Sequence, residues 1–215
     1  MQINEYIDHT LLKPTATPDH IITLCDEAKQ YEFVAVCVNG CYVTLAKEQL
    51  LNSEIKIASV IGFPLGAMAT NAKVFEASQS VLDGADEIDM VINLGLLKAK
   101  AFKTLEHEIL EIKKEIGDRV LKVIFETCYL TDTEIKIACK LSINAGADYI
   151  KTSTGFGSGG ATFDTVKLMK AEVKDQLKIK ASGGIKNTTT AKKYIDLGVS
   201  RIGTSSGIQI VLNPQ

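Results

Sequence analysis

"GADYIK", residues 146–151, has two counterparts in the chain: "GADEID" at 84–89 and "GVSRIG" at 198–203. Each copy begins with a glycine that follows a helix-like stretch and continues into a short run that favours a strand. Glycine is the usual residue in the left-handed position just after a helix, so the run behind it is the next strand. The three copies therefore predict three helix-to-strand junctions.

Five further apolar runs predict five more strands. They are "IDHTLL" (7–12), "FVAVCV" (33–38), "KIASVIGF" (56–63), "VLKVIFET" (120–127) and "KIKASGG" (178–184). Helical patterns fill most of the intervals, clearly so at 19–31 and 71–84, whereas the first strand is the least distinct. Strand–helix alternation repeated eight times predicts an α/β fold, a (β/α)8 TIM barrel in which residues 1–215 form a single domain.

Composition points to a small-molecule substrate. The 215 residues are 46% hydrophobic and 23% charged, with a net charge of −2 and interspersed signs. No basic stripe indicates nucleic acid, and no basic amphipathic face indicates a membrane. The first ten residues lack an apolar core of the kind found in signal peptides, and no stretch approaches about 18 uncharged apolar residues. We therefore expect a cytoplasmic protein without nucleic-acid or membrane partners.

Neither the cysteines nor the histidines have the spacing of a metal site. The cysteines are at positions 25, 37, 41, 128 and 139, and the histidines at 9, 20 and 107. An odd number of cysteines without C-x-x-C spacing, and histidines without an i,i+4 pair, predict no disulfide framework and no metal. Cys37 and Cys128 fall in apolar strand-like runs, so we expect both to be small buried hydrophobes.

Counting from the junction glycines places candidate residues inside the barrel. Five residues beyond each glycine stand Asp89, Lys151 and Gly203, which should lie at similar heights on their strands. Side chains alternate along a strand, and the apolar parity must face the helices. In "EIDMVI" (87–92) this leaves Glu87 and Asp89 for the interior.

The same parity turns three lysines, Lys122, Lys151 and Lys180, towards the interior beside Asp89. A lysine inside a packed barrel needs a chemical reason to be there. Crowded ammonium groups and burial both disfavour protonation, and moving a lysine pKa from about 10.4 to about 7 takes roughly 4 to 5 kcal/mol. A neutral buried amine attacks carbonyl groups and forms a Schiff base.

Glycine-rich segments follow the last three predicted strands. They are "TGFGSGG" (154–160), "SGGIKN" (182–187) and "GTSSG" (203–207). In barrels of this kind the loops after the last strands often bind phosphate through backbone N–H groups. Three such segments side by side favour a phosphate site over simple turns.

Motifs along nearly the whole chain resemble those of the deoxyribose-phosphate aldolases. In order they are "IDHTLLKP", "VCVN", "IGFPLGA", "EIDMVINLG", "LKVIFET", "YIKTSTGF", "KASGGI" and "RIGTSSG". The resemblance implies a class I aldolase, a carbon–carbon lyase of deoxyribonucleotide catabolism that needs no cofactor. Its reaction would reversibly cleave 2-deoxy-D-ribose 5-phosphate to D-glyceraldehyde 3-phosphate and acetaldehyde. The family is often dimeric or tetrameric, so a homo-oligomer is expected.

The resemblance also implies a role for each candidate residue. Lys151 would be the Schiff-base lysine, Lys180 the neighbour that lowers its pKa, and Asp89 the proton-relay carboxylate. The residues implied to bind the substrate phosphate are Gly155, Gly183, Gly184, Gly203, Ser205 and Ser206. Lys186 stands where relatives often carry arginine, which replaces a bidentate group by a point charge.

Two other interpretations remain open from the residues alone. Another phosphate-binding barrel enzyme, such as an isomerase, would need the glycine-rich loops but not two inward lysines. A non-catalytic sugar-phosphate-binding barrel would use Lys151 and Lys180 only to pair with phosphate or Asp89. Borohydride reduction with acetaldehyde separates the three, because only a Schiff-base enzyme becomes covalently modified.

Overall fold

The three predicted junctions are present. Gly84, Gly146 and Gly198 each follow a helix and adopt a positive φ, of 111°, 76° and 90° respectively. A residue with a Cβ is strained in that conformation, so glycine lets the chain leave the helix and enter the next strand. Each junction leads into a parallel strand within a few residues.

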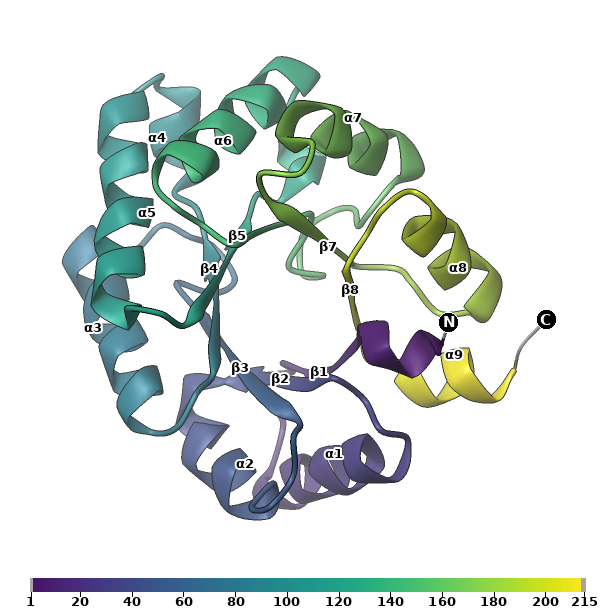
Figure 1. Cartoon of the computed structure of the whole chain (residues 1–215). Coiled ribbons are helices and arrows are strands. Elements are labelled where there is room, and N and C mark those ends of the chain that lie inside the picture. The colour runs from purple at the N-terminus through teal and green to yellow at the C-terminus, as the bar shows by residue number, and fades with distance from the viewer. Residues whose placement is uncertain (1, 214–215) are drawn as a thin grey trace.

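Eight parallel strands form a closed barrel in chain order within residues 2–213, the part of the chain that the computed structural model describes (Figure 1). The strands are β1 (Ile7–Leu11), β2 (Ala35–Asn39), β3 (Lys56–Ile61), β4 (Glu87–Val91), β5 (Val120–Ile124), β6 (Tyr149–Lys151), β7 (Lys178–Ser182) and β8 (Arg201–Thr204). The (β/α)8 barrel is confirmed, including its indistinct first strand, which pairs with β2 and β8.

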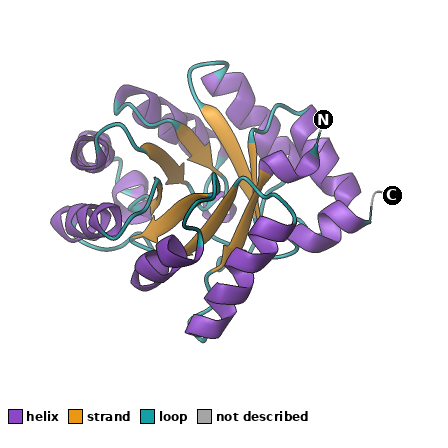
Figure 2. Ribbon diagram, turned by 60° about the horizontal axis from the view of Figure 1, so that its bottom comes forward, coloured by secondary structure: helices purple, strands orange, loops and turns teal. Residues whose placement is uncertain are grey.

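Helices surround the strands on the outside, as Figures 1 and 2 show. They are α1 (Pro18–Gln30), α2 (Val43–Gln49), α3 (Thr70–Leu82), α4 (Leu94–Lys98), α5 (Phe102–Ile116), α6 (Asp132–Asn144), α7 (Phe163–Val173), α8 (Thr188–Asp196) and α9 (Gly207–Leu212). The predicted helices at 19–31 and 71–84 are α1 and α3, displaced by one or two residues. Within residues 2–213, no helix has the length and apolar character needed to cross a membrane.

The strand parity is as predicted. Ile88 and Met90 on β4, and Ile92 directly after it, face outwards and join the large core between strands and helices. A separate small cluster within the barrel includes Cys37 and Val60. Apolar side chains therefore fill the space outside the strands and part of the space inside the barrel, and polar side chains occupy the remaining interior positions.

The register of the strands places the candidate residues at one height. Following the paired residues once around the barrel displaces the register by about one residue per strand, which is the shear of a (β/α)8 barrel. With that stagger, Asp89, Lys151 and Gly203 lie at the same level around the ring. The count from the junction glycines is therefore confirmed.

The prediction for one cysteine was wrong. Cys37 is buried as expected, but Cys128 is exposed. β5 ends at Ile124, and Glu126 then adopts a left-handed conformation with φ 53° and ψ 62°. The turn carries Cys128 into a short 3-10 helix (Thr127–Tyr129) on the surface instead of continuing the strand.

Candidate active site

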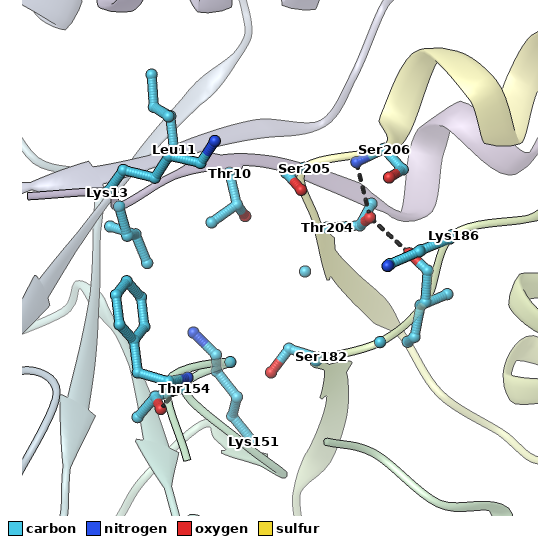
Figure 3. Close-up of a pocket in the computed structure, with 17 residues that line it drawn as sticks. Thr10, Leu11, Lys13, Lys151, Thr154, Ser182, Lys186, Thr204, Ser205 and Ser206 are labelled. Carbon is cyan, nitrogen blue, oxygen red and sulfur yellow. Dashed lines mark hydrogen bonds between the residues drawn. The ribbon is translucent and has the colours of Figure 1, made fainter. Parts of the chain in front are cut away.

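A pocket of about 370 Å³ lies at the carboxyl ends of β1, β6, β7 and β8. This is the end of a (β/α)8 barrel where the loops build active sites. Lys151 lines the pocket together with all six predicted phosphate-binding residues, which are Gly155, Gly183, Gly184, Gly203, Ser205 and Ser206. Residues from three segments that are distant in sequence thus border one cavity (Figure 3).

Lys151 is the last residue of β6 and is 2% exposed. Figure 3 shows its amine directed into the pocket, near Thr154 and across from Ser182. Its Nζ lies 2.8 Å from Asp89 Oδ2. The side chain therefore reaches both the cavity and a buried carboxylate.

Six buried ionisable side chains next to Lys151 form a closed ring of ion pairs, which we call the charge ring. In order around it stand Asp8, Lys180, Asp89, Lys122, Glu87 and Arg201, which returns to Asp8. The N–O distances are 2.5 Å for Asp8–Lys180, 2.8 Å for Lys180–Asp89, 2.7 Å for Asp89–Lys122, 2.5 Å for Lys122–Glu87 and 2.5 Å for Glu87–Arg201. Carboxylates and cations alternate, so the ionised ring is neutral.

Asp89 and Lys180 are held in their charged forms. Burial raises the pKa of the Asp89 carboxyl, but the nearby lysines outweigh it and hold that pKa well below the usual range. Burial lowers the pKa of Lys180, yet the Asp8 and Asp89 carboxylates raise it well above its ordinary value. Lys180 is therefore a lasting cation beside Lys151, and Asp89 is a lasting anion.

Lys151 is a seventh charge-bearing group attached to this ring. Both oxygens of every ring carboxylate already face a ring cation, so Lys151 shares Asp89 Oδ2 with Lys180. Among the described residues, Asp89 is the only carboxylate within ion-pair distance of Lys151. With the ring itself neutral, an ammonium at Lys151 gives the seven groups a net charge of +1, whereas a neutral amine leaves them neutral.

Glycine is needed in the loops for close packing as well as for turning. Gly183 has φ +86°, and a Cβ there would lie 2.8 Å from the Cα of Gly160 in the preceding loop. A Cβ on Gly203 would lie 3.0 Å from Cε of Lys180, so this glycine makes room for the buried lysine while it lines the pocket. Any larger residue at these two positions would move the loops or the lysine.

The amide of Ser206 is already engaged. Its N–H donates to Thr204 Oγ1 at 2.9 Å, and that hydroxyl donates to the carbonyl of Ile185 at 2.7 Å (Figure 3). These bonds join the loops after β7 and β8. The hydroxyl group is therefore what Ser206 offers to a ligand, in place of the backbone amide that the glycine-rich pattern suggested.

Several residues of the site were not singled out from the sequence. Lys13 lines the pocket, and Asp8 and Arg201 complete the charge ring. Arg201 is two residues before Gly203, so the same strand parity could have found it. Lys186, noted only as a departure from a motif, also borders the cavity.

Glu126 was also missed, because no sequence pattern marks its role. It is buried, and its carboxylate accepts hydrogen bonds from the hydroxyl and the backbone N–H of Thr154, the latter at 3.2 Å. Thr154 Oγ1 in turn accepts from the N–H of Phe156 at 3.0 Å. The left-handed turn at the end of β5 thereby fixes the loop that follows Lys151.

Residues 4–212 match the DeoC/LacD family of aldolases. The deoxyribose-phosphate aldolase of Finegoldia magna is 54% identical over 211 residues, covering 98% of this chain and 99% of that protein. That of Thermococcus gammatolerans is 55% identical over 216 residues, covering 98% and 96%.

Solved structures agree with the sequence comparison. A protein described as QR15, an aldolase, superposes with a TM-score of 0.95 at 44% identity, covering 98% of this chain and 95% of its own. The deoxyribose phosphate aldolase of Aeropyrum pernix, described as a unique tetramer, superposes with a TM-score of 0.89 at 32% identity, covering 97% and 89%. The chain therefore belongs to the DeoC/LacD family of aldolases.

Proposed function

We propose that this chain is a class I aldolase that reversibly cleaves 2-deoxy-D-ribose 5-phosphate to D-glyceraldehyde 3-phosphate and acetaldehyde. The observation that carries the proposal is the position of Lys151, whose amine points into the pocket beside the Asp89 carboxylate. The relatives at 54% and 55% identity are named for this activity. An isomerase or a simple binding barrel has no use for a third lysine beside a neutral charge ring.

In the proposed mechanism, Lys151 is the nucleophile. Its neutral amine attacks C1 of the open-chain sugar, and loss of water leaves an iminium ion. When the C3 hydroxyl loses its proton, the C2–C3 bond breaks and its electrons move into an enamine between C2, C1 and nitrogen. D-Glyceraldehyde 3-phosphate leaves, C2 takes a proton, and hydrolysis of the iminium releases acetaldehyde and the free amine.

Asp89 and Lys180 handle charge and protons around this step. Lys180 is a fixed cation that disfavours a second ammonium at Lys151. Asp89 is ionised and lies 2.8 Å from each of these two amines. Its carboxylate therefore orients both amines and accepts hydrogen bonds from the groups that carry the proton. Because its pKa is held so low, Asp89 relays a proton through water or a lysine and does not retain it.

We assign the phosphate group of the substrate to the part of the pocket formed by the loops after β7 and β8. Gly183, Gly184 and Ser205 supply small or hydroxyl-bearing positions there, and Ser206 adds its hydroxyl group. Lys186 borders the same region and adds a positive charge. Binding a remote dianion orients the sugar so that C1 faces the amine.

Trapping the Schiff base tests this proposal. Acetaldehyde with borohydride is expected to add one ethyl group to Lys151 and to abolish turnover, as read by peptide mass spectrometry. Lys122 and Lys180 in the same sample are internal controls, because both are lysines inside the same barrel. Labelling of either control with Lys151 unmodified would overturn the assignment.

Three broader features of the protein are also part of the proposal. Residues 1–215 form one domain, supported by a barrel that uses strands from β1 to β8. A homo-oligomer is supported by the tetramer described for the relative from Aeropyrum pernix. A cytoplasmic location is consistent with a sugar-phosphate substrate and with the interspersed surface charges.

A further inference from the structure

The far side of the charge ring has no contact with the pocket. Glu87 begins β4 and Arg201 begins β8, and neither side chain lines the cavity. They pair at 2.5 Å, and Glu87 also contacts Lys122 while Arg201 contacts Asp8. Glu87 is 3% and Arg201 8% exposed, so water screens this pair little.

The formal charge of the ring depends on this pair. With three carboxylates and three cations the ring is neutral, so no ring carboxylate remains to balance an ammonium at Lys151. Removing Glu87 alone would make the ring positive, and removing Arg201 alone would make it negative. Either change alters the electrostatic cost of placing an ammonium at Lys151.

We propose that Glu87 and Arg201 are positioning residues that keep the charge ring neutral and thereby set the pH at which Lys151 becomes a nucleophile. They act through Lys122, Asp89, Asp8 and Lys180, never through the substrate. This inference rests on the proposed Schiff-base chemistry and extends it to the opposite end of the barrel.

The other titratable groups near Lys151 are unchanged by substitutions in this pair. Among the described residues outside the ring they include Cys37, Lys13, Lys186 and Glu126. Tyr149, two residues before Lys151 on β6, interacts with Arg201 and is present in every variant. Burial raises the pKa of the Cys37 thiol, so it stays protonated and adds no charge. Lys13 and Lys186 are at the mouth of the pocket, and Glu126 is hydrogen-bonded to Thr154. A shift seen in the variants below therefore reports the ring.

The test follows the rate of Lys151 labelling by acetaldehyde and cyanoborohydride as a function of pH. No phosphate-bearing substrate is present, so the titration of phosphate does not enter. Glu87→Gln removes a negative charge, and the pH of half-maximal labelling should fall by about one unit. Arg201→Gln removes a positive charge, and the same midpoint should rise by about one unit.

The double variant is the decisive comparison. Glu87→Gln with Arg201→Gln restores a neutral ring and should return the midpoint to its wild-type value. General damage to the barrel would slow labelling in both single variants without moving their midpoints in opposite directions. Shifts of the same sign, or no shift in folded proteins, would overturn the proposal.

A matched control is available outside the barrel. Lys73 and Glu108 form an equally buried ion pair at 2.8 Å between α3 and α5. Glu108→Gln removes the same kind of charge and should leave the midpoint unchanged. Should both single ring variants fail to fold, the neutral double variant and the charge-conserving Arg201→Lys must keep the wild-type midpoint. A shift in either would refute the proposal.

The two proposals fail in different ways. If wild-type Lys151 is not labelled at all, the Schiff-base function is wrong. If Lys151 is labelled but the midpoints of Glu87→Gln and Arg201→Gln do not separate, only the role of the charge ring is wrong.

Discussion

The single residue that connects the ring to the pocket is Asp89. Its carboxylate accepts from Lys122 through Oδ1 and from both Lys151 and Lys180 through Oδ2. Three amines hold its pKa well below the usual range, which makes it a weak base. Such a group orders proton donors and passes protons onward, so its removal should affect bond cleavage more than imine formation.

Asp89→Asn tests this separation of roles. Proton transfer by a positioned group is worth about 10²- to 10⁴-fold, so the rate of sugar cleavage should fall by at least about 100-fold. Labelling of Lys151 by acetaldehyde and borohydride should persist, because the variant removes a negative charge that favours an ammonium at this position. Near-normal cleavage, measured in the same preparation, would show that Asp89 transfers no proton.

The residues that could be predicted are those that follow strand parity. Counting from the junction glycines found Asp89 and Lys151 because the register of a barrel repeats from strand to strand. Asp8 was missed because no junction glycine precedes β1, so there was no position from which to count. The ion pairs themselves could not be predicted, because they join strands that are far apart in sequence and depend on barrel closure.

At the scale of elements, three loops make the binding side of the pocket. The loops after β6 and β7 touch through Gly160 and Gly183, and hydrogen bonds through Thr204 join the loops after β7 and β8. The glycine-rich pattern predicted their position. It could not predict the left-handed turn at Glu126, because a positive φ at a residue other than glycine depends on tertiary contacts.

Ser206→Asp tests whether these loops bind phosphate. A carboxylate placed against the substrate dianion should raise KM for the 5-phosphate while leaving free 2-deoxyribose little affected. The measured quantity is the ratio of kcat/KM for the two sugars, which should fall. Ser158→Asp adds the same charge in the exposed part of the loop after β6, outside the pocket, and should leave the ratio unchanged. An unaltered ratio in Ser206→Asp would mean that the loops only turn the chain.

At the scale of the whole molecule, the charge ring takes the place of apolar side chains in part of the barrel. It joins five of the eight strands, which are β1, β4, β5, β7 and β8. A buried ring of this kind is stable only while its carboxylates are ionised, since a protonated member leaves a cation without a partner. Stability of the barrel is therefore tied to pH.

The sign of this dependence follows from the aspartates. Burial raises the pKa of Asp8, but Lys180 and Arg201 outweigh it and lower the pKa to about 2, from an ordinary value of 3.8. The nearby lysines likewise hold the pKa of Asp89 well below its ordinary value, against the effect of burial. A carboxyl group with a depressed pKa in the folded state contributes stability above its unfolded pKa and loses it as pH falls through the folded value.

We therefore expect the contribution of the charge ring to wild-type stability to stay nearly constant between pH 7 and 4 and to fall steeply between pH 4 and 2. The measured quantity is the urea concentration at the midpoint of unfolding. Asp8→Asn should cost about 3–5 kcal/mol at pH 7, because it leaves Lys180 and Arg201 short of a partner, and should flatten the fall below pH 4. Asp164→Asn, at a surface ion pair, is the control and should follow the wild type. If the urea midpoint of the Asp8 variant falls as steeply below pH 4 as that of the wild type, acid sensitivity comes from other carboxylates. The ring then does not govern the stability of the barrel.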